Sequence, residues 1–140
     1  MNQDTASKAK EIVRRFNQEV IGKDDERAFA ELVAPEFKNR SAPPGFPDGP
    51  EGMWRMFHDM LRPALPDLSV EILDQLVDGD RVVTRKTLRG THRGALFGIA
   101  ATGRAVSIDV IDVVRVQGGR YVEHWGVNTL GAVLAELQRA

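Results

Sequence analysis

An aspartate and a histidine on two predicted neighbouring strands are the residues of this sequence best suited to proton transfer. Residues 109–125, DVIDVVRVQGGRYVEHW, alternate side chains of different character on either side of a glycine pair. This pattern is typical of a β-hairpin, and it places Asp112 on the more apolar face of its strand. A carboxylate there loses hydration, so it needs a partner to remain charged.

The length of the hairpin loop decides which residue lies opposite Asp112. A three-residue loop with Gly119 in a left-handed conformation places His124 opposite Asp112. A two-residue turn at Gly118-Gly119 shifts the register by one and places Trp125 there instead. We favour the first register. On the face of Asp112 it predicts Val122, His124, Gly126 and Asn128, and on the other face Trp125 with Ile111 and Val113.

A carboxylate and an imidazole held together in an apolar cleft form a proton-transfer couple whose affinities can be tuned toward neutrality. The hypothesis assigns Asp112 as the acid/base and His124 as its proton partner. Buried Asp–His pairs also serve as structural hydrogen bonds between strands. Periodicity alone does not separate these two roles.

Other polar and aromatic side chains are candidates for binding a substrate. Arg40 is either a fixed cation that holds a carboxylate or enolate, or an ordinary surface residue. Trp54, Phe57 and His58 lie within one and a half turns of a predicted helix, where they line a pocket or, for the two aromatics, only fill the core. His92 points either inward near the end of its strand or into solvent.

Composition excludes several classes of site. The chain has 140 residues and no cysteine, so disulfides, thiolate metal sites and a cysteine nucleophile are absent. The three histidines lack metal-ligand spacing, so we expect no metal. The glycine pairs lack the strand-to-helix context of a phosphate-binding loop, so we expect no nucleotide cofactor. A formal net charge of −1 without a basic stripe argues against nucleic acid, and no apolar run is long enough for a membrane span. These features predict a cytoplasmic protein.

The pattern of apolar residues predicts helices followed by strands. Helical periodicity covers residues 5–22 and 24–34, and Pro50 begins a third helix that ends near residue 65. A loop rich in proline and glycine, residues 41–50, precedes this helix. Strand periodicity follows from residue 68, with a hairpin turn at Asp78-Gly79-Asp80, and a short helix ends the chain. The expected fold is one α+β domain, residues 1–140, with helices on one face of an antiparallel sheet.

Three stretches of this chain resemble the SnoaL-like polyketide cyclases, also called ester cyclases. They are residues 16–37, 43–104 and 111–125, the last containing IDVVRVQGGRYVEHW. The resemblance implies the cone of the nuclear-transport-factor-two-like superfamily, in which three helices close over the concave face of a curved sheet. It also implies a pocket inside the cone and an aldol ring closure that needs no metal or cofactor.

The chain departs from the cyclases at positions that the resemblance makes catalytic. Those proteins carry an aspartate directly after the tryptophan of the EHW motif, and this chain has Gly126. Their Val-Asp-His segment is Lys38-Asn39-Arg40 here, and a second aspartate is Asn128. Aldol cyclisation therefore cannot simply be transferred, and Asp112, on the same face, is the remaining carboxylate for proton transfer.

Two hypotheses about function follow. The first is a cofactor-independent cyclase, isomerase or hydrolase acting on a small, mostly apolar carbonyl compound, with Asp112 and His124 moving the proton and Arg40 or Asn128 steadying negative charge. The second is a module that binds a hydrophobic ligand without chemistry, which Gly126 favours. Under either hypothesis, a homodimer through the back of the sheet would cover an apolar patch that includes Trp125.

Overall fold

The computed structural model describes residues 3–139, which form helices and a five-stranded sheet. The helical segments are α1 (Gln3–Arg15), continued by the π-helical turn η1 (Phe16–Ile21); α2 (Glu26–Leu32); α3 (Pro50–Arg55), continued by η2 (Met56–Leu61) and α4 (Arg62–Ala64); and α5 (Leu130–Leu137). The strands are β1 (Val33–Asn39), β2 (Ser69–Asp78), β3 (Arg81–Thr91), β4 (Ala105–Gln117) and β5 (Arg120–Asn128). This arrangement confirms the predicted α+β class.

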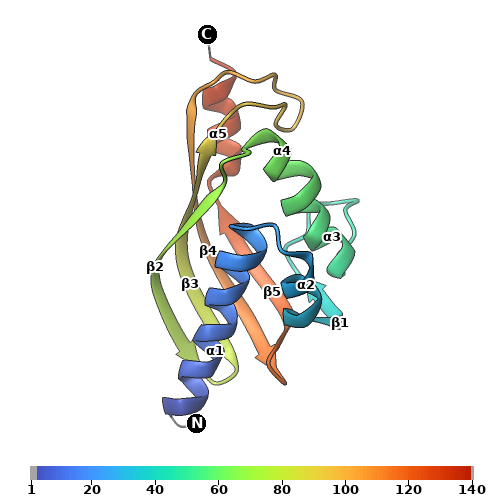
Figure 1. Cartoon of the computed structure of the whole chain (residues 1–140), viewed down its shortest axis with the longest axis vertical. Helices are drawn as coiled ribbons and strands as arrows, with labels where there is room; N and C mark the ends of the chain where they lie inside the picture. Colours follow the sequence, from blue (N-terminus) through green and yellow to red (C-terminus); the bar gives the residue numbers. More distant parts are fainter. Residues whose placement is uncertain (1–2, 140) are drawn as a thin grey trace.

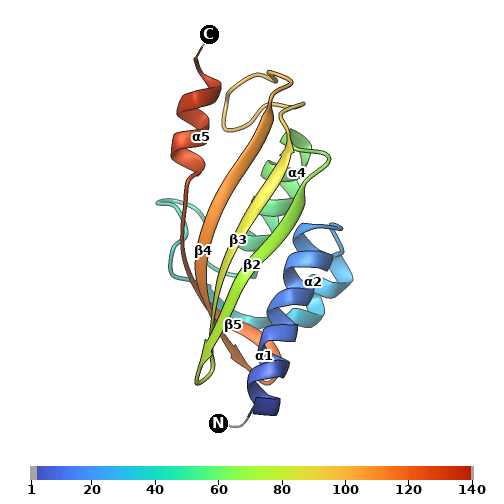
Figure 2. The same cartoon turned by 90° about the vertical axis from the view of Figure 1, so that its left-hand side faces the viewer.

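All helices before β2 lie on one face of the sheet. The strand order is β1-β5-β4-β3-β2, and every neighbouring pair is antiparallel except β1 and β5, which are parallel. Figure 1 shows the sheet curving around α1, α2, α3 and α4. Figure 2 faces the opposite side, where β2, β3 and β4 have no helix in front of them. The concave face therefore forms the core, and the other face is open.

The first strand corrects the prediction for residues 33 and 34, which were expected to end a helix. The N-cap of α2 is Asp25, whose side chain accepts from the Ala28 N–H. The helix ends at Leu32 because Pro35 follows two residues after Val33 and disfavours helical backbone at the intervening alanine. Val33 then takes up extended geometry and begins β1.

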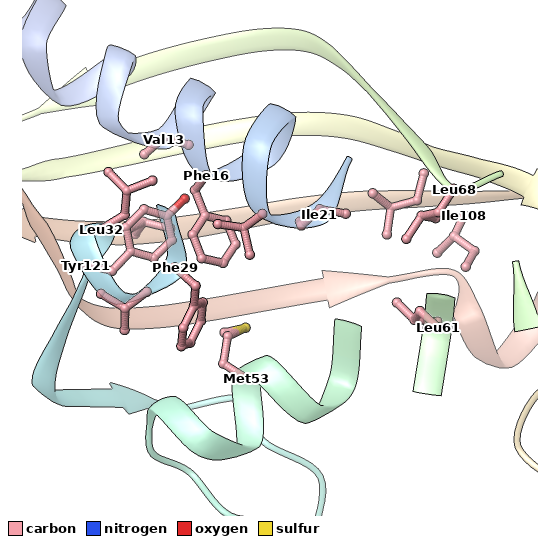
Figure 3. Packing of buried hydrophobic residues seen from close by; sticks show 14 of the residues in the cluster. Val13, Phe16, Ile21, Phe29, Leu32, Met53, Leu61, Leu68, Ile108 and Tyr121 are labelled. Carbon is pink, nitrogen blue, oxygen red and sulfur yellow. The ribbon is translucent and has the colours of Figure 1, made fainter. Parts of the chain in front are cut away.

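The buried face of α1 and η1 packs against aromatic residues from other elements. Phe16 is 2% exposed and stacks on Tyr121 of β5, with ring centroids 4.4 Å apart. The ring centroids of Phe29 in α2 and Phe16 are 6.2 Å apart, and Met53 of α3 lies beside the same cluster (Figure 3). This packing holds the helices against β5. The cavity described below lies between the sheet and α3.

The hairpin between β4 and β5 has a register that the sequence analysis did not predict. Gly118 and Gly119 both have positive φ and form the two-residue turn, so the favoured three-residue loop is wrong. Val122 then bulges between two paired positions, which shifts the register by one more residue and places Gly126 opposite Asp112. Because the two shifts add up to two residues, the residues of β5 beyond the bulge keep the faces that were predicted for them. The prediction that His124, Gly126 and Asn128 share the face of Asp112 is therefore confirmed. Val122, which was predicted on the same face, lies in the bulge instead, and Tyr121 pairs with Val116.

Within the described part of the chain, none of the helices combines the length and apolar character needed to cross a bilayer.

Candidate functional site

A cavity of about 240 Å³ lies between the sheet and the helices α3 and η2. Its walls are mainly apolar, with polar side chains gathered on the sheet side. The apolar part of the wall includes Met53, Met56, Phe57, Leu61, Leu88, Phe97, Ile108 and Val110, and the polar part includes Asn39, Ser41, Lys86, Asp112, His124 and Asn128. The cavity thus has the character of a site for a small, mostly apolar molecule.

One wall of the cavity depends on a glycine that has no room for a side chain. A Cβ atom on Gly52 would lie 2.0 Å from the backbone oxygen of Pro47. Only glycine at this position lets the proline-rich loop pack against the first turn of α3. The loop in turn brings Pro43 and Phe46 to the cavity.

Asp112 is the centre of a polar network on the cavity floor. It is 5% exposed. Its Oδ2 atom lies 3.3 Å from the Lys86 Nζ and 3.4 Å from the His124 Nε2. Both partners sit diagonally across from Asp112 on adjacent strands, since Thr84 and Gly126 are the residues directly opposite it. The predicted Asp–His pair is therefore in contact, with a lysine as a third member.

Two asparagines anchor the ends of this network. Asn17, fully buried at the start of η1, donates from Nδ2 to the Val13 carbonyl and accepts from the Lys86 ammonium at 2.6 Å. At the other end, the Asn39 Oδ1 lies 2.8 Å from the His124 Nδ1. The network therefore runs from the first helix to the first strand across three central strands.

The Asn39 contact determines which nitrogen of His124 carries a proton. The Ser41 backbone N–H can only donate, and it lies 3.0 Å from the same Asn39 Oδ1 atom. That atom is therefore an acceptor, so the Nδ1 of His124 must be the donor. In the neutral ring, the Nε2 atom facing Asp112 then has a lone pair that can accept a proton.

The charge of Asp112 results from opposing effects. Burial favours the neutral acid, but the positive charge of Lys86 and the contact with the protonated form of His124 together outweigh burial and lower the pKa of Asp112. Its Oδ1 atom is buried and has no hydrogen-bond partner among residues 3–139. Asp112 is thus held as a carboxylate that presents one oxygen to two cationic or potentially cationic groups.

Gly126 gives the His124 ring its space. A Cβ atom at Gly126 would lie 3.1 Å from the His124 Cε1 and 3.3 Å from the Asp112 Cβ. A side chain at this position would therefore require the imidazole or Asp112 to shift by a few tenths of an ångström. The imidazole therefore occupies the side of the cavity toward which a side chain at position 126 would point.

The other residues predicted from the sequence are distributed between the cavity and the surface. Phe57 and Asn128 line the cavity, although the Asn128 Oδ1 also accepts from the Leu130 N–H at the start of α5. Trp54 packs on Phe29 and on the ring of His58, outside the cavity lining. His58 is 44% exposed and bonds Asp24 at 2.8 Å, which raises its pKa.

Arg40 and His92 are also outside the cavity lining. The Arg40 side chain is 50% exposed and pairs with Glu123 at 2.9 Å, so the surface alternative for Arg40 fits the structure. His92 is fully buried, and its Nδ1 accepts from the Thr102 N–H while its Nε2 lies 3.2 Å from the Ile99 carbonyl. His92 therefore holds the loop between β3 and β4 from the interior, and the solvent-exposed alternative is wrong.

Lys86 and Asn17 are members of the network that sequence reasoning missed, although each left a signal. In β3, Lys86 alternates with Val82, Thr84 and Leu88, all buried, so it lies on the inward face. Asn17 follows Val13 by four residues and lies on the buried face of its helix. A polar residue on an apolar face was the available clue in both cases.

Residues 4–139, whose side chains the structure describes, contain no group of three or more histidine and acidic side chains arranged to hold a metal ion. The polar network offers one carboxylate oxygen that is already shared by Lys86 and His124. The donor set therefore does not fit a divalent cation, which prefers several carboxylate or imidazole ligands.

Comparison with known proteins supports the fold and identifies the family. The sequence pattern of the SnoaL-like polyketide cyclases matches residues 11–137. A protein of Acidithiobacillus ferrooxidans proposed to be a polyketide cyclase is 29% identical, with a TM-score of 0.82 over 99% of this chain and 98% of that one. IdmH of Streptomyces antibioticus, also proposed to be a polyketide cyclase, is 28% identical, with a TM-score of 0.81 over 94% and 99%.

A third solved structure carries a different proposed activity. AclR of Streptomyces galilaeus, proposed to be a hydroxylase, is 25% identical, with a TM-score of 0.76 over 96% of this chain and 95% of that one. No curated protein matches the sequence. Because the family pattern and the shared fold both extend over almost the whole chain, this protein belongs to the SnoaL-like polyketide cyclase family.

Proposed function

We propose that this protein catalyses cofactor-independent acid/base chemistry on a small, mostly apolar carbonyl compound, either an aldol-type ring closure or a related isomerisation or hydrolysis. The observation that carries the proposal is the contact between the His124 Nε2 and the Asp112 Oδ2 at 3.4 Å on the floor of an apolar cavity. A base and its counter-ion in a site of low polarity are the minimum needed to remove a proton beside a carbonyl.

The geometry favours His124 as the group that carries the proton. The Asp112 Oδ1 is buried, and the Oδ2 is already shared by Lys86 and His124, so the carboxylate is poorly placed to reach a ligand. Lys86 also makes Asp112 a weaker base by lowering its pKa. Asp112 would instead stabilise the imidazolium that forms when the Nε2 accepts a proton, while Asn39 keeps the ring in the required tautomer.

The proposed ring closure proceeds in two proton transfers. The His124 Nε2 removes a proton from the carbon beside a carbonyl, and the electron pair moves to the carbonyl oxygen as an enolate. The enolate carbon attacks a second carbonyl of the same molecule, which forms the new C–C bond and leaves an alkoxide. The imidazolium returns its proton to that alkoxide. The apolar wall of the cavity would fold the molecule for this attack.

The second candidate is a module that binds a hydrophobic ligand without chemistry. Gly126 supports it, because the resemblance to the cyclases implies an aspartate at this position. The same small residue also provides the space that the His124 ring uses, so a glycine here is compatible with both candidates.

Native mass spectrometry of the purified protein separates the two candidates. The catalytic proposal expects a bound carbonyl compound whose isolated form is converted to a rearranged product when it is incubated with the protein. A compound recovered unchanged after prolonged incubation would contradict catalysis and favour the binding module.

We also propose that two copies of this chain pair through the open face of the sheet. Leu76, Val83, Val113 and Trp125 form one row across β2, β3, β4 and β5, because each is the register partner of the next. Leu76 is 68% exposed and Val127, also on this face, is 71% exposed. An apolar row of this kind in water is typical of an interface, and a two-fold arrangement would cover both copies at once.

Sedimentation should therefore give a dimer at micromolar concentration, and the double substitution Leu76→Glu/Val127→Glu should give a monomer. Two carboxylates in the buried centre of the interface would lose hydration without gaining a partner. The control is Ala30→Glu on the exposed side of α2, which should remain dimeric. A wild-type protein that sediments as a monomer would contradict the proposed interface.

A further inference from the structure

Lys86 is a buried cation that the proton transfer described above does not use. Its side chain is 5% exposed and projects from the middle of β3 into the cavity wall. The ammonium has three N–H groups, and the structure accounts for two of them, with the Asn17 Oδ1 at 2.6 Å and the Asp112 Oδ2 at 3.3 Å. Among residues 3–139, no third acceptor contacts this ammonium, and Lys86 is part of the cavity lining.

Stability is a weak reason for a charged pair at this position. Lys86 and Asp112 lie in a sheet interior whose neighbouring inward positions are Val82, Leu88 and Ile108. Removing two charges from water is costly, and well-packed apolar residues in place of a buried ion pair are often neutral or stabilising. Asn17, a polar residue on the buried face of its helix, is committed to the same ammonium. This arrangement is better explained by a ligand that requires a fixed positive charge.

The charge balance of the site changes in the direction that such a ligand would need. At rest, the carboxylate of Asp112 compensates Lys86. When a ligand gives its proton to His124, the ring beside the Asp112 Oδ2 becomes a positively charged imidazolium. The ligand then carries one negative charge. Besides that imidazolium, Lys86 is the only cationic side chain among the described residues that line the cavity. The Arg40 side chain lies at the surface, paired with Glu123.

We infer that Lys86 is the anion-stabilising residue of the cavity: its ammonium binds the ligand oxygen on which negative charge develops. The inference rests on the proposed acid/base function and specifies the class of ligand. That class is a carbonyl compound or phenol that binds as a neutral, apolar molecule and whose conjugate base carries its charge on oxygen. A donor fixed before the reaction stabilises such a charge more effectively than water, which must reorient.

The binding of p-nitrophenol tests this role without a known substrate. The neutral and ionised forms of this probe absorb at different wavelengths, so a titration reports which form the cavity binds. At a pH where the free probe is mostly neutral, wild-type protein should bind the phenolate preferentially. The test variants are Asp112→Asn, which leaves Lys86 without its counter-charge, and the double variant Lys86→Met/Asp112→Asn, which removes both charges.

The two variants should change phenolate binding in opposite directions. Asp112→Asn should strengthen it, because the whole charge of Lys86 becomes available to the probe. The double variant should weaken it roughly ten-fold or more relative to Asp112→Asn, as expected when a fixed donor to an oxyanion is lost. A thermal melt of each variant establishes that the protein used is folded, and the double variant avoids an uncompensated buried charge.

Equal phenolate binding by Asp112→Asn and the double variant would overturn the assignment of Lys86, as would bound probe that is neutral in all three proteins or no binding at all. None of these three outcomes would contradict the proposed proton transfer by His124 and Asp112, because the experiment measures charge stabilisation and involves no turnover. Conversely, a protein that shows the expected phenolate preference but converts no ligand would retain the Lys86 site and lose the proposed catalysis.

Discussion

Replacing Asp112 with leucine should lower the free energy of unfolding by about 3–5 kcal/mol, because the Lys86 ammonium would remain in the sheet interior without a counter-charge. The side chains of both residues are almost fully buried, and their charged atoms lie 3.3 Å apart. Asn17 would still accept one hydrogen bond from the ammonium, but a neutral amide does not balance a charge. Urea unfolding at neutral pH measures the change, with the m value compared between variants.

The double substitution Lys86→Met/Asp112→Leu is the control for this prediction. It removes both charges and should recover most or all of the lost stability, since apolar pairs of similar volume often replace buried ion pairs at no cost. A double variant as unstable as Asp112→Leu would mean that shape, and not charge, makes Asp112 important for folding.

The same pair predicts a specific response to acid. The pKa of Asp112 in the folded protein lies below its ordinary value of 3.8. Its contribution to stability is therefore complete above about pH 4 and is lost as the pH falls through the folded-state pKa. Urea unfolding repeated at decreasing pH should show this loss in the wild type. The double variant should lack that part of the dependence, because it has no carboxylate at position 112.

A His124→Gln variant should convert the ligand identified by native mass spectrometry about 10²–10⁴-fold more slowly than the wild type. Glutamine can still donate a hydrogen bond to Asn39 or Asp112, but it cannot accept and return a proton near neutral pH. The reduction is expected in kcat, because the apolar wall that binds the ligand is unchanged. Initial rates over a range of ligand concentrations separate kcat from KM.

His58 provides a matched control on the same protein. It is the exposed histidine, bonded to Asp24 outside the cavity, so His58→Gln should leave turnover unchanged. Circular dichroism of both variants establishes that neither has lost its fold. Equal activity of His124→Gln and the wild type would contradict the assignment of His124 as the proton carrier. It would favour Asp112 as the acid/base instead.

The sequence by itself determined the class of the fold and placed Asp112 on the more apolar face of its strand. Whether His124 shares that face depends on the hairpin register, because side chains alternate and a shift of one residue would separate the two. The predicted face is confirmed because the two-residue turn and the bulge at Val122 each shift the register by one, although His124 is not directly opposite Asp112. The helix signal of Pro50 is local as well, and α3 begins at Pro50 as predicted.

The register and the composition of the network were decided only by tertiary structure. The bulge at Val122 adds one residue to β5, and no local signal in the sequence marks it. Lys86 and Asn17 lie 69 residues apart in the chain and meet only because η1, which carries Asn17, packs against β3. Asn39 reaches His124 because β1 joins the sheet in parallel beside β5, a pairing between segments 85 residues apart. Local periodicity reports which way a side chain faces, whereas its partners depend on how distant segments pack, and packing is a property of the whole chain.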